Sequence, residues 1–411
     1  MLIKLAWRNL WRNKLRTGIM LGAMIFGLMG VVTMMGFMSG MVDNMVHNAI
    51  AWQTSHVQVQ NRHYIENPDI TDLIDKPNVV FDYLSRNPDV LAWSGRFLAD
   101  GMIGSARSTR GVRIIGVNMD SESRVTPILS SITQGESLAL EGRNPVLVSQ
   151  KIAGRLKLRI GSKVVLTFTD GLGEVTGSAF RVRGLFKTPS TTFDDNNVYV
   201  RKRDVEKIAH LTGVHEIAIL LKEEMNTQKE GDLSEFTAQL RALSSEKNRV
   251  RDWTKVQPML ASMIATMGIS NVIMLAIFVI AMGFGIVNIM LMSVFERTQE
   301  FGVLMAVGMQ KHKIFLLIML ETIWLGICGA ALGLLASMTM IQVLQFTGLP
   351  LGGMAEGLGA YGVDTVLYPR VSAYEYEVIF FTVVFSSIIA ALYPARQILK
   401  QRPVEAMSEK H

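Results

Sequence analysis

The sequence predicts a membrane α-helical protein with four transmembrane helices and one large α+β extracytoplasmic domain. Hydrophobic residues make up 49% of its 411 residues, and the mean hydropathy is +0.28. This composition is too apolar for an ordinary soluble protein and too polar for a bundle that lies wholly in lipid. Four apolar runs reach the length of about 20 residues that a bilayer requires, whereas residues 52–258, between the first and the second run, contain none.

The first 16 residues predict an amphipathic helix at the membrane interface. They contain five Lys or Arg residues, together with Trp7 and Trp11. Tryptophan rings favour the headgroup level, and basic side chains favour anionic lipid. A signal-peptide n-region is the alternative, but the apolar run that follows is longer than the roughly 7–15 residues of a signal h-region. No small-residue cleavage site follows it, so we expect an uncleaved first span that extends beyond the bilayer to residue 50.

Four methionines at the outer end of this span are spaced like one face of a helix. Methionine is flexible and adapts to irregular apolar ligands. Two interpretations stay open: the stripe faces an apolar substrate such as an acyl chain, or it packs against a partner helix. The substrate-facing candidates are Met34, Met38, Met41 and Met45.

Residues 51–258 alternate between strand-like and helix-like patterns, which predicts an α+β domain. Cys328 is the single cysteine and lies in an apolar run, so the domain has no intramolecular disulfide and depends on its apolar core. The predicted strands are 55–60, 112–117, 145–149, 163–169, 180–186, 197–200 and 214–221, and the predicted helices are 150–158, 204–211 and 236–243.

The third span contains two features that differ from a plain apolar helix. Gly329 and Gly333 have the GxxxG spacing that lets two helices approach closely. Glu321 is the one acid within an apolar run, and an intramembrane acid is a functional candidate by default. The alternatives for Glu321 are that it extends toward the membrane surface, or that it pairs with Thr322 or with a basic group of a neighbouring helix. Structural, coupling and proton-transfer roles all stay open.

Basic residues predict the topology. They are frequent in residues 1–16, 296–313 and 395–411, whereas the loop 346–373 holds only Arg370. Positive charge marks the cytoplasmic side, so both termini are expected in the cytoplasm and the large domain in the periplasm, in a bacterial inner membrane. Because the basic residues cluster beside apolar runs, they indicate topology and contact with membrane lipid rather than nucleic-acid binding.

Several catalytic patterns are missing from the sequence. It contains no G-x-x-x-x-G-K-[ST] loop for ATP phosphates, no G-x-S-x-G nucleophile motif, and no metal-ligand spacing among its seven histidines. We therefore expect a non-enzymatic chain with no catalytic residue, no metal site and no bound cofactor. If ATP and Mg²⁺ are used, a partner subunit binds them.

The segment ERTQEFGVLMAVGMQKH, Glu296 to His312, lies between the second and third apolar runs and predicts a short amphipathic helix. Phe301, Leu304, Met305 and Val307 bracket one face, and Gly308 stands where the helix is expected to stop. The pattern E-R-x-x-E-F-G-x-L-x-A-x-G resembles the signature of the FtsX/MacB/LolC superfamily of ABC transporter permeases. The resemblance implies a cytoplasmic coupling helix that docks into a separate ATPase. It assigns ATPase coupling to Glu296, Arg297, Glu300, Phe301, Gly302, Leu304, Ala306 and Gly308.

The resemblance extends over essentially the whole chain. The run NPVLVSQKIAGRLKLRIGSKVVL is similar to a strand–helix–strand segment of that superfamily's periplasmic core domain, and the tail from Tyr393-Pro394-Ala395 is similar to its closing motif. The implied fold is therefore of the MacB periplasmic-core type, with a layout like the lipoprotein-releasing LolC and LolE permeases. The implied partners are a cytoplasmic ABC ATPase, a second permease copy or homologous permease, and a periplasmic carrier or adaptor.

The resemblance implies mechanotransmission, in which ATP hydrolysis by the partner does conformational work in the periplasm. Release of lipoproteins or lipidated cargo is the favoured role, and the alternatives are MacB-like efflux of peptides or amphiphiles and FtsX-like signalling to a cell-wall hydrolase. LolC captures its carrier with a long hairpin, whereas the corresponding turn here, Asp170 to Ser178, is short. MacB carries its ATPase on the same chain, and FtsX has a much smaller outer domain.

The expected organisation follows from these patterns. It comprises an interfacial helix (1–16), a first span with extension (17–50), the periplasmic domain (51–258), a stalk and second span (259–295), the coupling helix (296–313), a third span (314–345), an outer loop (346–373), a fourth span (374–394) and a cytoplasmic tail (395–411).

Overall fold

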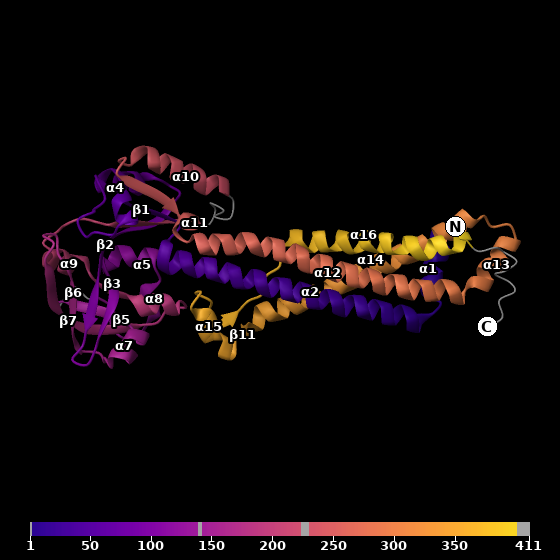
Figure 1. The fold of residues 1–411 in the computed structure, drawn as a ribbon, viewed down its shortest axis with the longest axis horizontal. Coiled ribbons are helices and arrows are strands. Elements are labelled where there is room, and N and C mark those ends of the chain that lie inside the picture. Colours follow the sequence, from indigo (N-terminus) through magenta and orange to yellow (C-terminus); the bar gives the residue numbers. More distant parts are fainter. Residues whose placement is uncertain (1, 139–141, 223–229, 401–411) are drawn as a thin grey trace. The chain divides into compact units, whose positions relative to one another are not determined.

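The computed structural model describes residues 2–138, 142–222 and 230–400 (Figure 1). The chain divides into two compact units, which we call the helical unit and the sheet unit. The helical unit comprises Met1–Val42, Ile264–Pro350 and Val366–His411, and the sheet unit comprises Asp43–Met263 and Leu351–Thr365.

Four of the described helices are long and apolar enough to cross a membrane. They are α2 (Lys14–Ala49), α12 (Pro258–Glu296), α14 (Lys311–Thr347) and α16 (Ala373–Lys400). This confirms the predicted number of spans. The helices extend beyond the predicted spans: α12 begins at Pro258 and α14 ends at Thr347, because helical hydrogen bonding continues past the apolar run.

Helix α14 is the most buried of the four, and three small residues allow this close packing. A Cβ atom at Gly329 would lie 2.4 Å from Met24 Cε, and one at Gly333 would lie 2.6 Å from Leu28 Cδ1, both on α2. On another side of α14, a Cβ atom at Gly326 would lie 2.1 Å from the Ser387 hydroxyl of α16. The predicted close approach at the GxxxG spacing is therefore confirmed.

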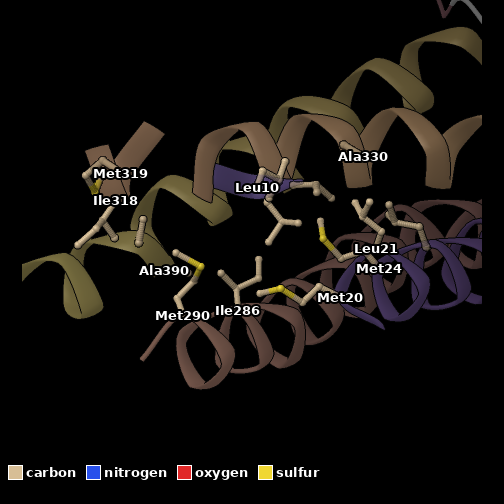
Figure 2. Packing of buried hydrophobic residues seen from close by; sticks show 14 of the residues in the cluster. Leu10, Met20, Leu21, Met24, Ile286, Met290, Ile318, Met319, Ala330 and Ala390 are labelled. Carbon is tan, nitrogen blue, oxygen red and sulfur yellow. The ribbon is translucent and has the colours of Figure 1, made fainter. Parts of the chain in front are cut away.

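Figure 2 shows the apolar core of the helical unit, to which all four long helices contribute. Buried methionines come from three of them: Met24 from α2, Met290 from α12 and Met319 from α14. Their flexible side chains suit irregular space between packed helices. The short helix α1 (Leu2–Leu10) packs against α14, where the rings of Trp7 and Trp324 meet edge to face at 5.2 Å.

An extended segment before α16 lies directly against α2. The Arg370 amide donates to the Gly36 carbonyl at 2.9 Å, and a Cβ atom at Gly40 would lie 2.5 Å from the Tyr368 carbonyl oxygen. The Gln345 side chain of α14 donates to the Pro369 carbonyl at 3.0 Å. The glycines of α2 thus leave room for extended backbone, whose polar groups are satisfied by the flanking helices.

The sheet unit is built on ten described strands in one sheet. Most of it follows the order β10-β1-β9-β2-β3-β8-β5-β7-β4, and β6 pairs with β2 and β7. The strands are β1 (Val57–Asn61), β2 (Val90–Gly104), β3 (Thr109–Val117), β4 (Ile132–Gly135), β5 (Pro145–Ser149), β6 (Lys163–Thr169), β7 (Val175–Phe186), β8 (Asn197–Arg201), β9 (Glu216–Leu221) and β10 (Asn248–Asp252).

Short helices and turns surround the sheet. They are η1 (Ile50–Thr54), α3 (Arg62–Glu66), α4 (Pro77–Arg86), α5 (Met119–Val125), α6 (Ile128–Ser131), α7 (Gln150–Leu156), α8 (Thr191–Asn196), α9 (Lys202–Ala209), α10 (Glu230–Leu243) and α11 (Trp253–Val256). Beyond α14 come β11 (Leu349–Pro350), η2 (Gly352–Met354), α15 (Ala355–Gly359) and β12 (Val366–Leu367).

Apolar clusters cover both faces of the sheet. Neighbouring residues of one strand belong to different clusters, as with Phe97 and Leu98 in β2 and with Ile114 and Ile115 in β3. A strand that is buried on both faces reads as a continuous apolar run. This explains why VRIIGV and PVLVS are apolar at nearly every position.

All seven strands that the sequence predicted are present in the sheet, two of them with the predicted bounds and five with shifted ends. Three described strands of the sheet, β2, β4 and β10, were missed. Strand β2 is central, but Gly95, Gly101 and the charged Arg96 interrupt its pattern. Strand β10 has the sequence NRVRD, in which only Val250 is apolar. Both strands are held by pairing with neighbours, a tertiary contribution that periodicity does not report.

Part of the outer loop belongs to the sheet unit, where it meets the end of α2. The Asn44 amide donates to the Asp364 carboxylate at 2.7 Å, and the Asp364 backbone N–H donates back to Asn44 Oδ1 at 2.8 Å. Asn48 donates to the Gly362 carbonyl at 2.7 Å. Asn44 and Asn48, two polar residues near the end of α2, therefore hold this loop.

Candidate functional site

Helix α13 (Thr298–Ala306) is the element predicted to couple, and its two ends are well defined. It begins directly after Arg297, whose φ of −105° breaks the helical path from α12. At its end, the Met309 N–H bonds to the Leu304 carbonyl and the Gly308 N–H to the Met305 carbonyl. Gly308 has a φ of +100°, so the end is a Schellman motif. The predicted stop at Gly308 is confirmed.

One face of α13 is anchored inside the helical unit. Phe301 is only 1% exposed and belongs to the apolar core, and Gly302 beside it is buried. The Arg297 guanidinium lies 5.1 Å from the centre of the Phe301 ring. Leu304 and Met305 are partly buried against the same core. Of the coupling candidates, Phe301 and Gly302 therefore pack within their own chain and are not exposed.

Arg297 also joins the start of α13 to α14. Its Nη1 lies 3.0 Å from Glu321 Oε2, and its Nε lies 3.2 Å from Glu300 Oε2. Glu321 is only 3% exposed, and an unpaired charge at such a place is costly. Of the interpretations open from sequence, the structure selects pairing with a basic group of a neighbouring element. That group is Arg297.

Two further ion pairs join the same region to the start of α2. Arg12 Nη2 contacts both carboxylate oxygens of Glu300, at 2.6 and 2.8 Å, and Arg16 Nη1 lies 3.0 Å from Glu296 Oε2. Burial acts to raise the pKa of Glu300, but hydrogen bonds from Arg12 and Arg297 outweigh burial and hold the pKa below its usual value. Glu300 thus stays ionised and holds two arginines from different elements.

These arginines were assigned to lipid contact from sequence alone. A signal for the pairing was present: Arg12 and Arg16 are four residues apart, as are Glu296 and Glu300. Equal spacing of opposite charges allows two pairs to form side by side, here in antiparallel order. The sequence could not show that these two stretches, about 280 positions apart, would meet.

The other face of α13 is open. Val303 is 54% exposed and Val307 is 83% exposed, and Ala306 between them is exposed as well. The sequence grouped Val307 on one face with Phe301, Leu304 and Met305, whereas Val307 is exposed and Phe301 is buried. Val307 follows the last helical residue and turns away within the C-terminal motif. An open apolar strip of small side chains therefore lies opposite the anchored face.

The four methionines of α2 do not share one environment. Met34 is 44% exposed, Met38 and Met41 are partly buried, and Met45 is only 4% exposed. Met34 is therefore the member most open to a ligand or a partner helix, whereas Met45 packs within the described chain. The stripe as a whole stays a prediction.

Two family models match the sequence. The model described as MacB-like periplasmic core domain matches residues 17–234, and the model described as FtsX-like permease C-terminal matches residues 272–403. Between them they cover the first span, most of the sheet unit and the last three spans. No curated protein matches the sequence.

Three solved structures are similar to parts of the chain. The periplasmic region of MacB from Actinobacillus actinomycetemcomitans is 13% identical, with a TM-score of 0.35 over 53% of this chain and 97% of that chain. The extracellular domain of the noncanonical ABC-type transporter YknZ from Gram-positive bacteria is 11% identical, with a TM-score of 0.33 over 48% of this chain and 100% of that chain. A domain of a putative permease from Porphyromonas gingivalis is 12% identical, with a TM-score of 0.29 over 48% of this chain and 86% of that chain.

Proposed function

Since the chain belongs to the FtsX/MacB superfamily of ABC transporter permeases, we propose that it couples ATP hydrolysis by a separate cytoplasmic ATPase to conformational work in the periplasm. In this proposal the ATPase binds α13 and moves it when ATP is hydrolysed. The chain lies in a bacterial inner membrane with both termini in the cytoplasm, and it works beside a second permease copy or a homologous permease. ATP and Mg²⁺ are held by the ATPase.

The observation that carries the proposal is the two-sided character of α13. Its open side offers Val303 and Val307, an apolar pair at i and i+4 that suits docking into a groove of a partner. Its anchored side is tied to α14 through Arg297 and Glu321, and to the turn directly before α2 through Arg12 and Glu300. A force applied to the open side therefore reaches two long helices directly, in addition to α12, to which α13 is joined by the chain.

We propose lipoproteins or other lipidated molecules as the cargo. Apolar side chains are exposed along α2, among them Ile19, Phe26 and Met34. A cavity of about 380 Å³ lies between α12 and α16, and Phe284 and Phe385 are among its mainly apolar lining residues. In a spanning helix such exposed side chains contact bilayer lipid, and the same apolar surface and cavity are compatible with the acyl chain of a lipid-linked cargo.

We propose no helix, strand or loop of this chain as the binding site for a periplasmic carrier. Strands β6 and β7 are joined by only the residues between Thr169 and Val175, so the chain lacks a long hairpin at this turn. A periplasmic carrier or adaptor, if one is used, docks elsewhere or on the second permease.

Docking is tested by copurification with the ATPase encoded beside this chain. The variant V303D/V307D is expected to lose the ATPase, because two carboxylates in an apolar contact are left desolvated. A matched control is Met354→Asp, which changes an exposed residue of the outer loop. Undiminished ATPase recovery with V303D/V307D, at normal membrane levels of the permease, overturns the assignment of α13.

Cargo is tested by native mass spectrometry of the gently purified assembly. A triacylated protein at stoichiometric amount supports the lipoprotein role. A bound periplasmic adaptor without acylated cargo favours efflux, and a bound hydrolase favours signalling. A photo-crosslinker at Met34 refines the result: acyl adducts support a cargo-facing methionine, whereas adducts only with permease helices support packing.

A further inference from the structure

A row of polar side chains crosses one face of the sheet on six neighbouring strands. Residues directly opposite each other in paired strands point to the same face. Arg251 of β10 pairs with Gln58 of β1, and Gln60 of β1 pairs with Glu216 of β9. The row continues from Glu216 to Arg96 of β2, and Arg113 of β3 lies opposite Asn197 of β8.

A cavity of about 320 Å³ lies over this row. Its floor includes the strand residues above, and its other walls include Trp52, Gln53, Tyr64, Phe193 and Gln257. The volume is near the lower end of the range of roughly 300–1,000 Å³ that is usual for small-ligand sites. The lining combines aromatic rings with carboxamide groups, so it can hold a ligand that has both apolar and hydrogen-bonding parts.

Most charges on the floor are already paired. Arg96 holds Glu122 at 2.7 Å and Glu216 at 2.8 Å, and all three are buried. Gln60 donates to the second oxygen of Glu216 at 2.8 Å. Arg113 is paired with Asp100 at 2.8 Å. These carboxylates are therefore engaged by their own chain.

Arg251 differs from the other two arginines. Its Nη2 donates to the neutral side-chain oxygen of Gln60. Its Nε is buried and has no hydrogen-bond partner among the described residues, and the described residues place no carboxylate within ion-pair distance. Burial lowers the pKa of Arg251, whereas the charge of Glu216 opposes this shift. A half-buried guanidinium that lines a cavity without an anionic contact has unused capacity to bind a carboxylate.

We propose that this cavity binds a short acidic peptide segment, with a carboxylate on Arg251 and peptide groups on the surrounding glutamines. A guanidinium binds a carboxylate through directed N–H donors. Gln257 donates to Gln53 Oε1 at 2.6 Å, and Gln58 donates to the Gln53 carbonyl at 3.2 Å. Each carboxamide has two N–H donors and an oxygen with two lone pairs, so these bonds leave each of them capacity for peptide N–H and C=O groups, whereas a phosphate offers mainly acceptors. The proposal concerns the sheet unit alone and does not depend on which cargo the permease moves.

The test uses the full chain in nanodiscs of neutral lipid and measures peptide retention by equilibrium dialysis. The probes are three pools of N-acetylated tripeptides. The first has uncharged side chains and a free C-terminal carboxylate. The second is the same pool ending in a carboxamide, and the third ends in a carboxamide but has Asp or Glu at its centre. Inorganic phosphate is the fourth probe.

Retention of the first pool, the third pool or both, without the second, supports the proposal and identifies the carboxylate as terminal or side-chain. Equal retention of the second pool, retention of phosphate alone, or retention of no probe overturns it.

The variant Arg251→Gln is expected to lower retention of the acidic pool at least about tenfold, because the charge-assisted bonds are lost. Arg249→Gln is the matched control, since Arg249 lies on the same face of β10 but is exposed and outside the cavity. Should Arg251→Gln not fold, Arg251→Lys keeps the charge and is expected to bind more weakly than the original protein. If the folded Arg251 variant retains the acidic pool as well as the original protein does, Arg251 does not bind the carboxylate and the proposal is overturned.

Discussion

Arg297 and Glu321 form an ion pair at 3.0 Å, although they are 24 positions apart and belong to different elements. Glu321 looks from sequence like an isolated acid in an apolar span, and Arg297 looks like a surface charge before an amphipathic helix. Their contact satisfies both and anchors the start of α13 on α14. Replacing Arg297 with an uncharged residue therefore leaves the buried Glu321 without its ion-pair partner.

Removal of either partner of this pair is expected to destabilise the helical unit. Arg297→Met leaves the buried Glu321 carboxylate without its partner and costs about 3–5 kcal/mol. Glu321→Leu is expected to cost less, because Arg297 keeps its contact with Glu300. The double variant R297M/E321L is expected to be more stable than the sum of the single losses implies, since neither charge is left alone. Thermal unfolding in detergent measures all four proteins, and additive losses contradict the pairing.

The pair between Arg12 and Glu300 is expected to matter for coupling more than for stability. Both side chains are about half exposed, and exposed pairs contribute about 0–1 kcal/mol. We expect Arg12→Glu to weaken stimulation of the partner ATPase by cargo, with little change in thermal unfolding. The swap R12E/E300R is expected to recover only part of the stimulation, because it restores the contact with position 12 but loses the pair between Glu300 and Arg297.

Arg8→Glu serves as the control for this experiment, because Arg8 lies in α1 outside the described ion-pair network. An equal defect in Arg8→Glu shows that the loss of positive charge, rather than the loss of the pair with Glu300, is responsible.

Packing between α14 and α16 gives a third prediction. Gly326→Ala places a methyl group 2.6 Å from Ser387 Cβ, so the helices must separate, and overpacking of this kind costs about 1–3 kcal/mol. Gly285→Ala in α12 is the matched control, because nothing lies within 4 Å of its new methyl group. A lower unfolding temperature is expected only for Gly326→Ala, and equal behaviour of the two variants is evidence against the packing.

A fourth prediction concerns Asp194 in α8 and pH. Burial raises the pKa of Asp194 to about 6, although hydrogen bonds from Thr188 oppose this effect. In the unfolded chain an aspartate titrates near 4, so the native state binds more protons between about pH 4 and 6. The contribution of Asp194 to stability is therefore largest below pH 4 and falls as pH rises through 6, by roughly 3 kcal/mol in total.

The variant Asp194→Asn removes this titration. Its unfolding temperature relative to that of the original protein is expected to be higher at pH 7.5 than at pH 4, whatever the fixed effect of the substitution. A difference that stays constant across this range shows that the pKa of Asp194 is close to its ordinary value.

Local sequence pattern alone was sufficient to predict the number of spans, the end of α13 and several of the strands. Span count follows from apolar run length, because each bilayer crossing needs about 20 apolar residues whatever lies around it. The stop at Gly308 follows from the positive φ that glycine adopts without strain. Strands such as Lys163–Thr169 follow from residue period and type. The motif at residues 296–308 predicted the FtsX/MacB superfamily, because such a motif is defined by the order of residues along the chain and needs no tertiary structure.

Only the tertiary structure determined which charged residues pair with one another and which apolar side chains are exposed. Pairing of Arg12 with Glu300, and of Arg297 with Glu321, depends on which helices become neighbours, and residue spacing carries no information about that. The exposure of Val307 depends on the turn after α13. Arg251 has no described carboxylate within ion-pair distance, because the carboxylates near it pair with other side chains. Composition and periodicity determine which segments are buried or membrane-spanning, whereas the partner of each charge is chosen only when the chain has packed.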